Sequence, residues 1–242
     1  METKTRSQMR KSHNKNWVNI LCILLAVGLL GIFLNFNKIK KNWDWITMKP
    51  RQELNVPLEK QLPDLPNGCE VTSLSMLLNY YHINVSKDKL AQNIKHVSSF
   101  TDDGQYRGNP HEGFVGYMSI ANAGWCVYNE PLYNVARKYT DRIQNATGSS
   151  FTHLLSLVSS GHPVMIITTL HFNKVNDMQT WKTKQGNVHV TPSSHACIIT
   201  GYDKKKRLVY VNDPYGVKNK AVSWNTIEAS YNQQGRQALY IN

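Results

Sequence analysis

The stretch SHACIITGYDKKKRLVYVNDP, residues 194–214, decides the fold. Two runs rich in isoleucine, valine and tyrosine flank a charged DKKK turn, which is the pattern of a β-hairpin. A three-residue loop at 203–205 would set His195 directly opposite Asp213. Opposed residues of an antiparallel pair share a face, with Cβ atoms roughly 5 Å apart, which is close enough for a carboxylate to hold an imidazole. A four-residue loop would shift this register by one residue and remove the direct opposition.

A second stretch, QLPDLPNGCEVTSLSMLLNYY at residues 61–81, predicts a helix over 70–81 that begins beside a cysteine. The apolar residues that recur at three- and four-residue spacing are Val71, Leu74, Leu77, Leu78 and Tyr81. Cys69 comes just before or in the first turn, where free backbone N–H groups and the helix dipole favour an anion. The position therefore favours the thiolate, which is the nucleophilic form of cysteine. A cysteine that only packs in the core is the alternative interpretation.

The remaining elements are predicted from apolar periodicity and from β-branched runs. Further helices are expected at 86–94, 130–140 and 150–160, the last one ended by Gly161. Strands are expected at 163–169, 195–202 and 208–212. Helices followed by strands are typical of an α+β fold.

Size and charge indicate one globular domain and one apolar segment. The chain has 242 residues and is 41% hydrophobic, enough for a single domain with its own core. Its formal net charge of +12 is uneven, because residues 1–41 carry eight Lys or Arg against one acid, and the remainder carries twenty against fifteen. The body is weakly basic and has no cluster of Lys and Arg interleaved with aromatic residues, so we expect no nucleic-acid partner.

The apolar run WVNILCILLAVGLLGIFL near the amino terminus is uncharged and long enough to span a bilayer. It does not end in small residues as a cleaved signal peptide does, so we expect an uncleaved anchor. Five basic residues precede the run and three follow it, which predicts a cytoplasmic tail and an extracellular body. The expected organisation is a basic cytoplasmic tail at 1–16, a single-pass anchor in the cell membrane at 17–35, a linker at 36–55 and a catalytic domain at 56–242.

The four cysteines are Cys22, Cys69, Cys126 and Cys197, and no two of them form a C-x-x-C pair. This spacing is neither a disulfide framework nor a zinc site, and we expect no metal and no other cofactor. If Cys126 and Cys197 bond to each other, Cys69 is still unpaired in the body. An unpaired thiol in an oxidising compartment calls for a chemical role.

Four segments together resemble a known family of enzymes. They are QLPDLPNGCEVTSLSMLLNYY at 61–81, GHPV at 161–164, SHACIITGYD at 194–203 and VYVNDP at 209–214. The ordered set resembles the bacteriocin-processing-type family of papain-like cysteine peptidases, and more narrowly its stand-alone extracellular branch in Gram-positive bacteria. The likeness runs over 56–242. It implies a papain-like domain with amino-terminal helices and a carboxyl-terminal antiparallel sheet, acting on a peptide or protein substrate.

The resemblance also implies a role for each matching residue. Cys69 matches the nucleophile, His195 the general base and acid, and Asp213 the residue that orients the imidazole. Gln61 matches the side chain that helps to form the oxyanion hole, with Asn67 as the next candidate.

The match departs from the transporter-fused branch of the family around the cysteine. That branch keeps its glutamine closer to the cysteine and has Asp-Cys-Gly where this chain has Gly68-Cys69-Glu70. Cleavage behind a double-glycine leader is therefore not implied. Other reactions on the same fold are alternatives, such as a peptidoglycan amidase or an acyltransferase, and so is an inactive binding module. The sequence does not specify the oligomeric state.

The remaining candidates are expected to be structural. His111, His171 and His189 are predicted to lie in loops or on partly exposed strands. The glycine-rich segment at 108–117 lacks a phosphate-loop lysine and is expected to be a loop that could line the substrate cleft.

Overall fold

The computed structural model describes residues 17–31, 43–121 and 123–242, which belong to two compact units. The first unit extends to Ile46 and the second comprises Thr47–Asn242. Residues 17–31 are helical. In the part of the chain that the structure describes, no helix has both the length and the apolar character needed to cross a membrane.

Two predicted segments extend outside the described residues. The basic tail at 1–16 lies wholly outside them, and the predicted anchor at 17–35 runs past the described helix. Both assignments stay predictions.

The second unit combines helices with a large antiparallel sheet. Its helices are α2 (Cys69–Tyr80), α3 (Lys87–Asn93), α4 (Asn129–Ala136), α5 (Phe151–Ser159) and α6 (Trp224–Gln233). The strands of the main sheet are β1 (Arg51–Glu53), β4 (Ile143–Asn145), β5 (Val164–Thr169), β8 (Ser194–Asp203), β9 (Leu208–Asp213), β10 (Val217–Ser223) and β11 (Ala238–Ile241). Two small sheets pair β2 (His96–Val97) with β3 (Phe114–Val115), and β6 (Gln179–Thr183) with β7 (Gly186–Val190).

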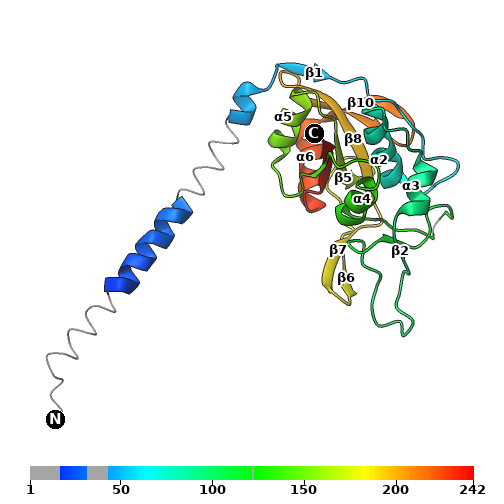
Figure 1. The fold of residues 1–242 in the computed structure, drawn as a ribbon, viewed down its shortest axis with the longest axis horizontal. Coiled ribbons are helices and arrows are strands. Elements are labelled where there is room, and N and C mark those ends of the chain that lie inside the picture. The colour runs from blue at the N-terminus through cyan, green and yellow to red at the C-terminus, as the bar shows by residue number, and fades with distance from the viewer. Residues whose placement is uncertain (1–16, 32–42, 122) are drawn as a thin grey trace, which may run out of the picture. The chain divides into compact units, whose positions relative to one another are not determined.

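The main sheet is built around β5 and β8. Its strand order is β10-β9-β8-β5-β11-β4, and β1 pairs with β8 off this path. α2 packs on one side of the central strands, and α5 and α6 lie on the other (Figure 1). Every residue of β5 is buried, as expected for a strand covered on both faces. The arrangement is the α+β fold that the sequence predicts.

The predicted helices form, and capping residues set their ends. Ser86 caps α3 and Ser150 caps α5, each by accepting a backbone N–H at 3.2 Å from the residue three positions on. α5 ends before Gly161, whose φ of +100° lies in the left-handed region that glycine adopts without strain. α4 ends at Ala136, four residues before the predicted end at 140. Apolar periodicity and β-branched runs do not predict α6, β10 or β11.

The β8–β9 hairpin forms, but its predicted loop is wrong. Asp203 pairs with Leu208, so the loop covers 204–207 and not 203–205. This longer loop alone would set Asp213 opposite Ile198 and turn it away from the face of His195, because side chains alternate along a strand.

A β-bulge in β8 restores the face that the predicted site needs. The register shifts by one residue between Ile199 and Gly201, which leaves Thr200 as the extra residue. Continuing the register beyond the bulge sets Asp213 opposite Cys197. Cys197 and His195 are two residues apart and share a face, so the carboxylate and the imidazole still point to the same side.

β1 lies unusually close to β8 at Gly201. A Cβ atom at this position would come within 2.4 Å of the Gln52 carbonyl oxygen. Residues 51–53 therefore pair with the sheet, although they fall in the segment predicted as linker, 36–55. Residues 36–42 of that segment lie outside the described residues.

We expect Gly201→Ala to lower the free energy of unfolding by about 1–3 kcal/mol, because the added methyl group must displace β1. Urea unfolding of the purified chain measures this change. Gln52→Ala is the matched control, since the clash involves the backbone carbonyl of Gln52 and not its side chain. It should stay within about 0.5 kcal/mol of the parent chain. Equal stability of the Gly201 variant would contradict the close approach of β1.

Candidate active site

Cys69 is the first residue of α2, with Gly68 at the N-cap position. Its side chain is buried, and the thiol donates to Oε2 of Glu70 at 3.2 Å. Burial, followed by the neighbouring Glu70 carboxyl, raises the pKa of this thiol well above its usual value, against an opposing hydrogen bond from the Ala196 backbone. The expectation of a favoured thiolate is therefore wrong for this arrangement. Loss of solvent and a nearby carboxyl outweigh the helix terminus.

His195 and Asp213 form a buried hydrogen bond. Nε2 of His195 lies 3.0 Å from Oδ1 of Asp213, and both side chains are almost fully buried. The ring of Tyr215 stacks on the imidazole, with centroids 5.2 Å apart and planes 17° from parallel, and Phe172 meets it edge-on at 6.1 Å. These contacts fix the plane of the ring. Nδ1 of His195 is buried and has no hydrogen-bond partner among the described residues, so it is free to take up a proton.

Three donors converge on the Asp213 carboxylate. Oδ1 accepts from His195 and from the Tyr215 backbone N–H at 3.1 Å, and Oδ2 accepts from Nζ of Lys220 at 2.9 Å. Burial alone would raise the pKa of Asp213, but the His195, Lys220 and Tyr215 contacts lower it well below its usual value. The carboxylate is therefore ionised at neutral pH and can stabilise an imidazolium.

The nucleophile candidate lies beside this pair. The Ala196 backbone amide, which acts on the Cys69 thiol, is adjacent in β8 to His195. Burial, and then the charge that Cys69 would carry as a thiolate, raises the pKa of Tyr215, the residue stacked on the imidazole. The fold thus joins His195 of β8 to Asp213 of β9 and places the start of α2, with Cys69, next to Ala196 and Tyr215. The role of Cys69 with this pair stays a prediction.

Gln61 is buried close to the carboxyl end of β9. Its backbone N–H donates to the carbonyl of Pro214 at 2.9 Å, and its Nε2 donates to the carbonyl of Pro66 at 2.7 Å. Oε1 is buried and has no hydrogen-bond partner among the described residues. One Nε2 hydrogen remains available, so Gln61 can still donate to an oxyanion.

Asn67, the alternative oxyanion donor, already uses its side-chain amide in other hydrogen bonds. Its Nδ2 donates to the carbonyls of Tyr117 and Ile120, at 3.0 and 2.7 Å. Both amide hydrogens are therefore used to hold the loop before Gly124. Gly124 itself lies so close to the Asn67 side chain that a Cβ atom at this position would clash with it.

Exposed apolar side chains gather beside these residues. Tyr215 is 48% exposed although it stacks on His195, and Val217 is 45% exposed where it pairs with Asp213. Leu62 follows Gln61 and is 46% exposed. Together they give the surroundings of the candidate site an apolar surface.

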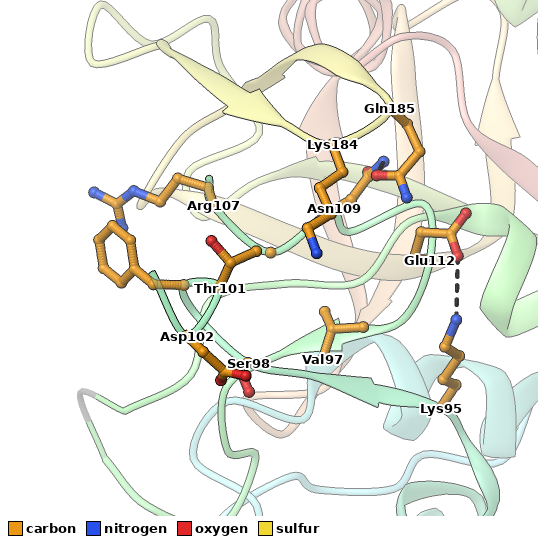
Figure 2. Close-up of a pocket in the computed structure, with 12 residues that line it drawn as sticks. Lys95, Val97, Ser98, Thr101, Asp102, Arg107, Asn109, Glu112, Lys184 and Gln185 are labelled. Atoms are coloured by element: carbon orange, nitrogen blue, oxygen red, sulfur yellow. Dashed lines mark hydrogen bonds and ion pairs between the residues drawn. The ribbon is translucent and has the colours of Figure 1, made fainter. Parts of the chain in front are cut away.

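A separate cavity of about 350 Å³ lies between the loop after β2 and the turn of the β6–β7 hairpin (Figure 2). The predicted loop at 108–117 lines it through Gly108, Asn109 and Glu112, and Glu112 pairs with Lys95 at 3.1 Å. None of the four predicted site residues lines this cavity. The loop at 108–117 therefore lines a cavity that is separate from the candidate active site.

His111 and His189, two of the histidines expected to be structural, have ordinary side-chain partners. His111 pairs with Glu130 at 2.7 Å, and His189 contacts Thr180 at 3.1 Å on the exposed β6–β7 hairpin. All four cysteines are free. No cluster of three or more His, Cys, Asp or Glu that could hold a metal ion occurs within 17–31, 43–121 and 123–242.

Two charged residues of the site were not predicted. Lys220 lies on β10, a strand whose sequence VKNKAVS shows no clear alternation, so nothing local marks it as a partner of Asp213. Glu70 reads as an ordinary polar residue in the first turn of a helix, yet it is 1% exposed. Its position next to Cys69 is the only local signal for its place in the site.

The chain is similar to known proteins over most of its length. Residues 53–239 match the model of the peptidase C39-like family. The uncharacterized protein YvpB of Bacillus subtilis (strain 168) is 42% identical over 191 residues, which is 78% of this chain and 75% of that protein. A crystal structure assigned as a C39-like peptidase from Bacillus anthracis is 39% identical, with a TM-score of 0.76 over 79% of this chain and 97% of that one. Both relatives come from Gram-positive bacilli. The family prediction is therefore confirmed: the chain belongs to the peptidase C39-like family of cysteine peptidases.

Proposed function

We propose that this chain is an active cysteine peptidase that hydrolyses peptide bonds outside the cell through Cys69, His195 and Asp213. One observation carries the proposal. The imidazole of His195 is buried and held by Asp213 at 3.0 Å through Nε2, which leaves Nδ1 without a hydrogen-bond partner among the described residues. The next residue, Ala196, interacts through its backbone with the thiol of Cys69 at the start of α2. A nucleophile, a base and a group that orients the base are the parts that acyl transfer requires.

In the proposed reaction, Nδ1 of His195 takes the proton of Cys69 and the thiolate attacks the carbonyl of the scissile bond. Asp213, itself held by Lys220, keeps the imidazole in place and stabilises the imidazolium. His195 then protonates the leaving amine, and water hydrolyses the thioester. Because burial disfavours the thiolate of Cys69, the thiolate and the imidazolium form together as an ion pair.

The oxyanion formed in this step is assigned to Gln61 and to the backbone N–H of Cys69. The remaining Nε2 hydrogen of Gln61 and the free N–H at the start of α2 support this assignment. One such donor contributes roughly 3–4 kcal/mol to the stabilisation of a transition state.

We also propose that the domain faces the outside of the cell and is held by the predicted anchor at 17–35. The support comes from the sequence, which has five basic residues before the apolar run and three after it. A free Cys69 is consistent with a catalytic thiol and not with a disulfide framework.

Cys69→Ser and His195→Ala should each lower kcat by about 10⁴-fold or more, because nucleophile and base act as one unit. Cys69→Ser is nearly isosteric and should leave the free energy of unfolding within about 1 kcal/mol. Asp213→Asn should retain more activity than either, since an amide oxygen can still accept the imidazole N–H. Cleavage of a peptide library and urea unfolding, measured on the same preparations, check these outcomes.

The double variant Cys69→Ser, His195→Ala should be barely slower than either single variant. His189→Ala is the control, because the side chain of His189 contacts Thr180 within the exposed β6–β7 hairpin and has no part in the proposed reaction, so the variant should keep full activity. Losses that multiply in the double variant, or full activity in a folded single variant, would contradict the pairing of nucleophile and base.

Gln61→Ala should lower kcat by roughly a hundredfold or more while Cys69 still reacts with iodoacetamide at the parent rate. The combination separates loss of an oxyanion donor from loss of folding. Gln144→Ala, an exposed glutamine on β4, is the control and should have no effect. An unchanged kcat for Gln61→Ala would show that another group donates to the oxyanion.

Protease added to intact cells should degrade the domain at 56–242, because the proposed topology places it outside the membrane. Immunoblotting before and after lysis measures its survival, with a cytoplasmic protein as the control. Protection of the domain until the cells are lysed would show that the proposed orientation is wrong.

A further inference from the structure

Glu70 is a buried carboxyl that the mechanism above does not use. Its Oε2 accepts the thiol hydrogen of Cys69 at 3.2 Å, and its Oε1 accepts the backbone N–H of Val127 at 3.2 Å. No Lys, Arg or His of the described residues forms an ion pair with it. The carboxyl therefore faces the nucleophile without a compensating cation.

A charge is not needed for the structural part of this arrangement. Holding the N–H of Val127 requires one acceptor oxygen, which the neutral amide of a glutamine also supplies. A buried and unpaired carboxylate costs stability, so a purely structural role would favour the amide. What a carboxyl adds is a proton that it can take up or release next to the thiol.

The thiol hydrogen is directed to the wrong acceptor for catalysis. It points to Glu70, whereas the Nδ1 atom of His195 that must receive it has no partner in the described chain. The structure thus contains a resting arrangement in which the nucleophile and the base are not yet connected.

We propose that Glu70 is a positioning residue that controls the nucleophile: its carboxylate holds the thiol hydrogen and keeps Cys69 neutral, and its protonated form releases that hydrogen to His195. The inference rests on the proposed function of Cys69 as the nucleophile. In the release step the S–H bond breaks and the proton moves to Nδ1, which gives a thiolate and an imidazolium. Glu70, protonated from solvent, then donates its own O–H to the sulfur.

The electrostatics of the site set the direction of this control. Burial raises the pKa of Glu70 to about 7, against smaller opposing contributions from its own backbone, Cys69 and Val127. Above this pH the carboxylate repels a thiolate, and below it the neutral acid stabilises one. Activation of the thiol is therefore favoured as the pH falls through about 7.

The other titratable groups around Glu70 do not produce the same effect. Cys126 and Tyr128 precede α4, and Tyr215 follows β9. Burial raises the pKa of each above its usual value, so all three are neutral near pH 7. His195 on β8 is the proton acceptor itself and belongs to the step being controlled.

The test is the pH profile of Cys69 alkylation by iodoacetamide in the full-length chain, with the labelled peptide identified by mass spectrometry. Glu70→Gln keeps an acceptor for Val127 and offers an N–H to the sulfur, so it imitates the protonated acid. Its alkylation midpoint should move to lower pH by about one unit, with a rate roughly tenfold higher than the parent at pH 8. A purely structural role for Glu70 would leave the midpoint unchanged.

The chain offers a matched control. Glu130 is also the second residue of a helix, α4, but it is half-exposed and pairs with His111. Glu130→Gln should leave the Cys69 profile as it is in the parent. Coinciding profiles for Glu70→Gln and the parent chain would overturn the inference.

A second measurement needs no variant and decides the matter if Glu70→Gln fails to fold. In the parent chain labelled with ¹³C at glutamate carboxyls, one carboxyl should titrate near pH 7, and its midpoint should move after Cys69 is alkylated. Titration of every glutamate near its ordinary value would overturn the inference.

These results separate the inference from the proposed function. A shifted profile in a chain that cleaves no peptide would leave the control by Glu70 standing and remove the peptidase. Peptide cleavage together with identical alkylation profiles for Glu70→Gln and the parent chain would support the peptidase and overturn the control by Glu70.

Discussion

The site depends on a hydrogen bond between two groups that are both removed from water. Nε2 of His195 and Oδ1 of Asp213 are 3.0 Å apart, and neither side chain is more than 2% exposed. Leaving one buried charge without its partner typically costs 3–5 kcal/mol, so the surrounding structure must supply every remaining contact. The Tyr215 backbone and Lys220 complete the carboxylate, and Tyr215 and Phe172 cover the ring. Residues at the end of the β8–β9 hairpin and on β10 therefore stabilise this one hydrogen bond.

The nucleophile is placed under an opposing constraint. The first turn of a helix favours an anion, but α2 is buried through its first ten residues and carries Glu70 against the thiol. Burial and the carboxyl prevail, so the pKa of Cys69 is raised. A thiol that is neutral at rest is protected from oxidation and from reaction with chance electrophiles, and in the proposed reaction it becomes reactive only when the imidazole accepts its proton. The same packing that stabilises α2 therefore limits the reactivity of its first residue.

The parts of the fold that local patterns encode were predictable, and the parts that distant contacts decide were not. Apolar spacing predicts α2, and β-branched runs predict β5, β8 and β9, because each segment buries its own face. The predicted hairpin register is wrong because the loop covers 204–207, and the bulge at Thr200 that restores the face is not visible in the local pattern; the Thr200 carbonyl accepts from the backbone N–H of Leu54, some 150 residues earlier in the chain. The actual geometry at His195 nevertheless keeps the predicted face.

The candidate site also contains residues that local sequence patterns indicate and residues that only distant contacts determine. Cys69, His195, Asp213 and Gln61 come from recognisable motifs, and the fold joins His195 to Asp213 by a hydrogen bond. Lys220 and the Val127 contact of Glu70 are not recognisable, since each joins segments whose proximity only the folded sheet creates.

The pairing of β1 with β8 has a mechanical consequence. β1 is where the segment from the amino-terminal unit joins the sheet, and it is hydrogen-bonded to the same strand that carries His195 at its other end. The two strands are antiparallel, so any tension carried by the chain before Thr47 reaches the sheet through the hydrogen bonds between β1 and β8. The load passes into the backbone of β8 at 201–203, on the far side of the Thr200 bulge from the imidazole. His195 lies at the opposite end of β8, so the point where the amino-terminal segment joins the sheet and the candidate site are separated along one strand by the bulge.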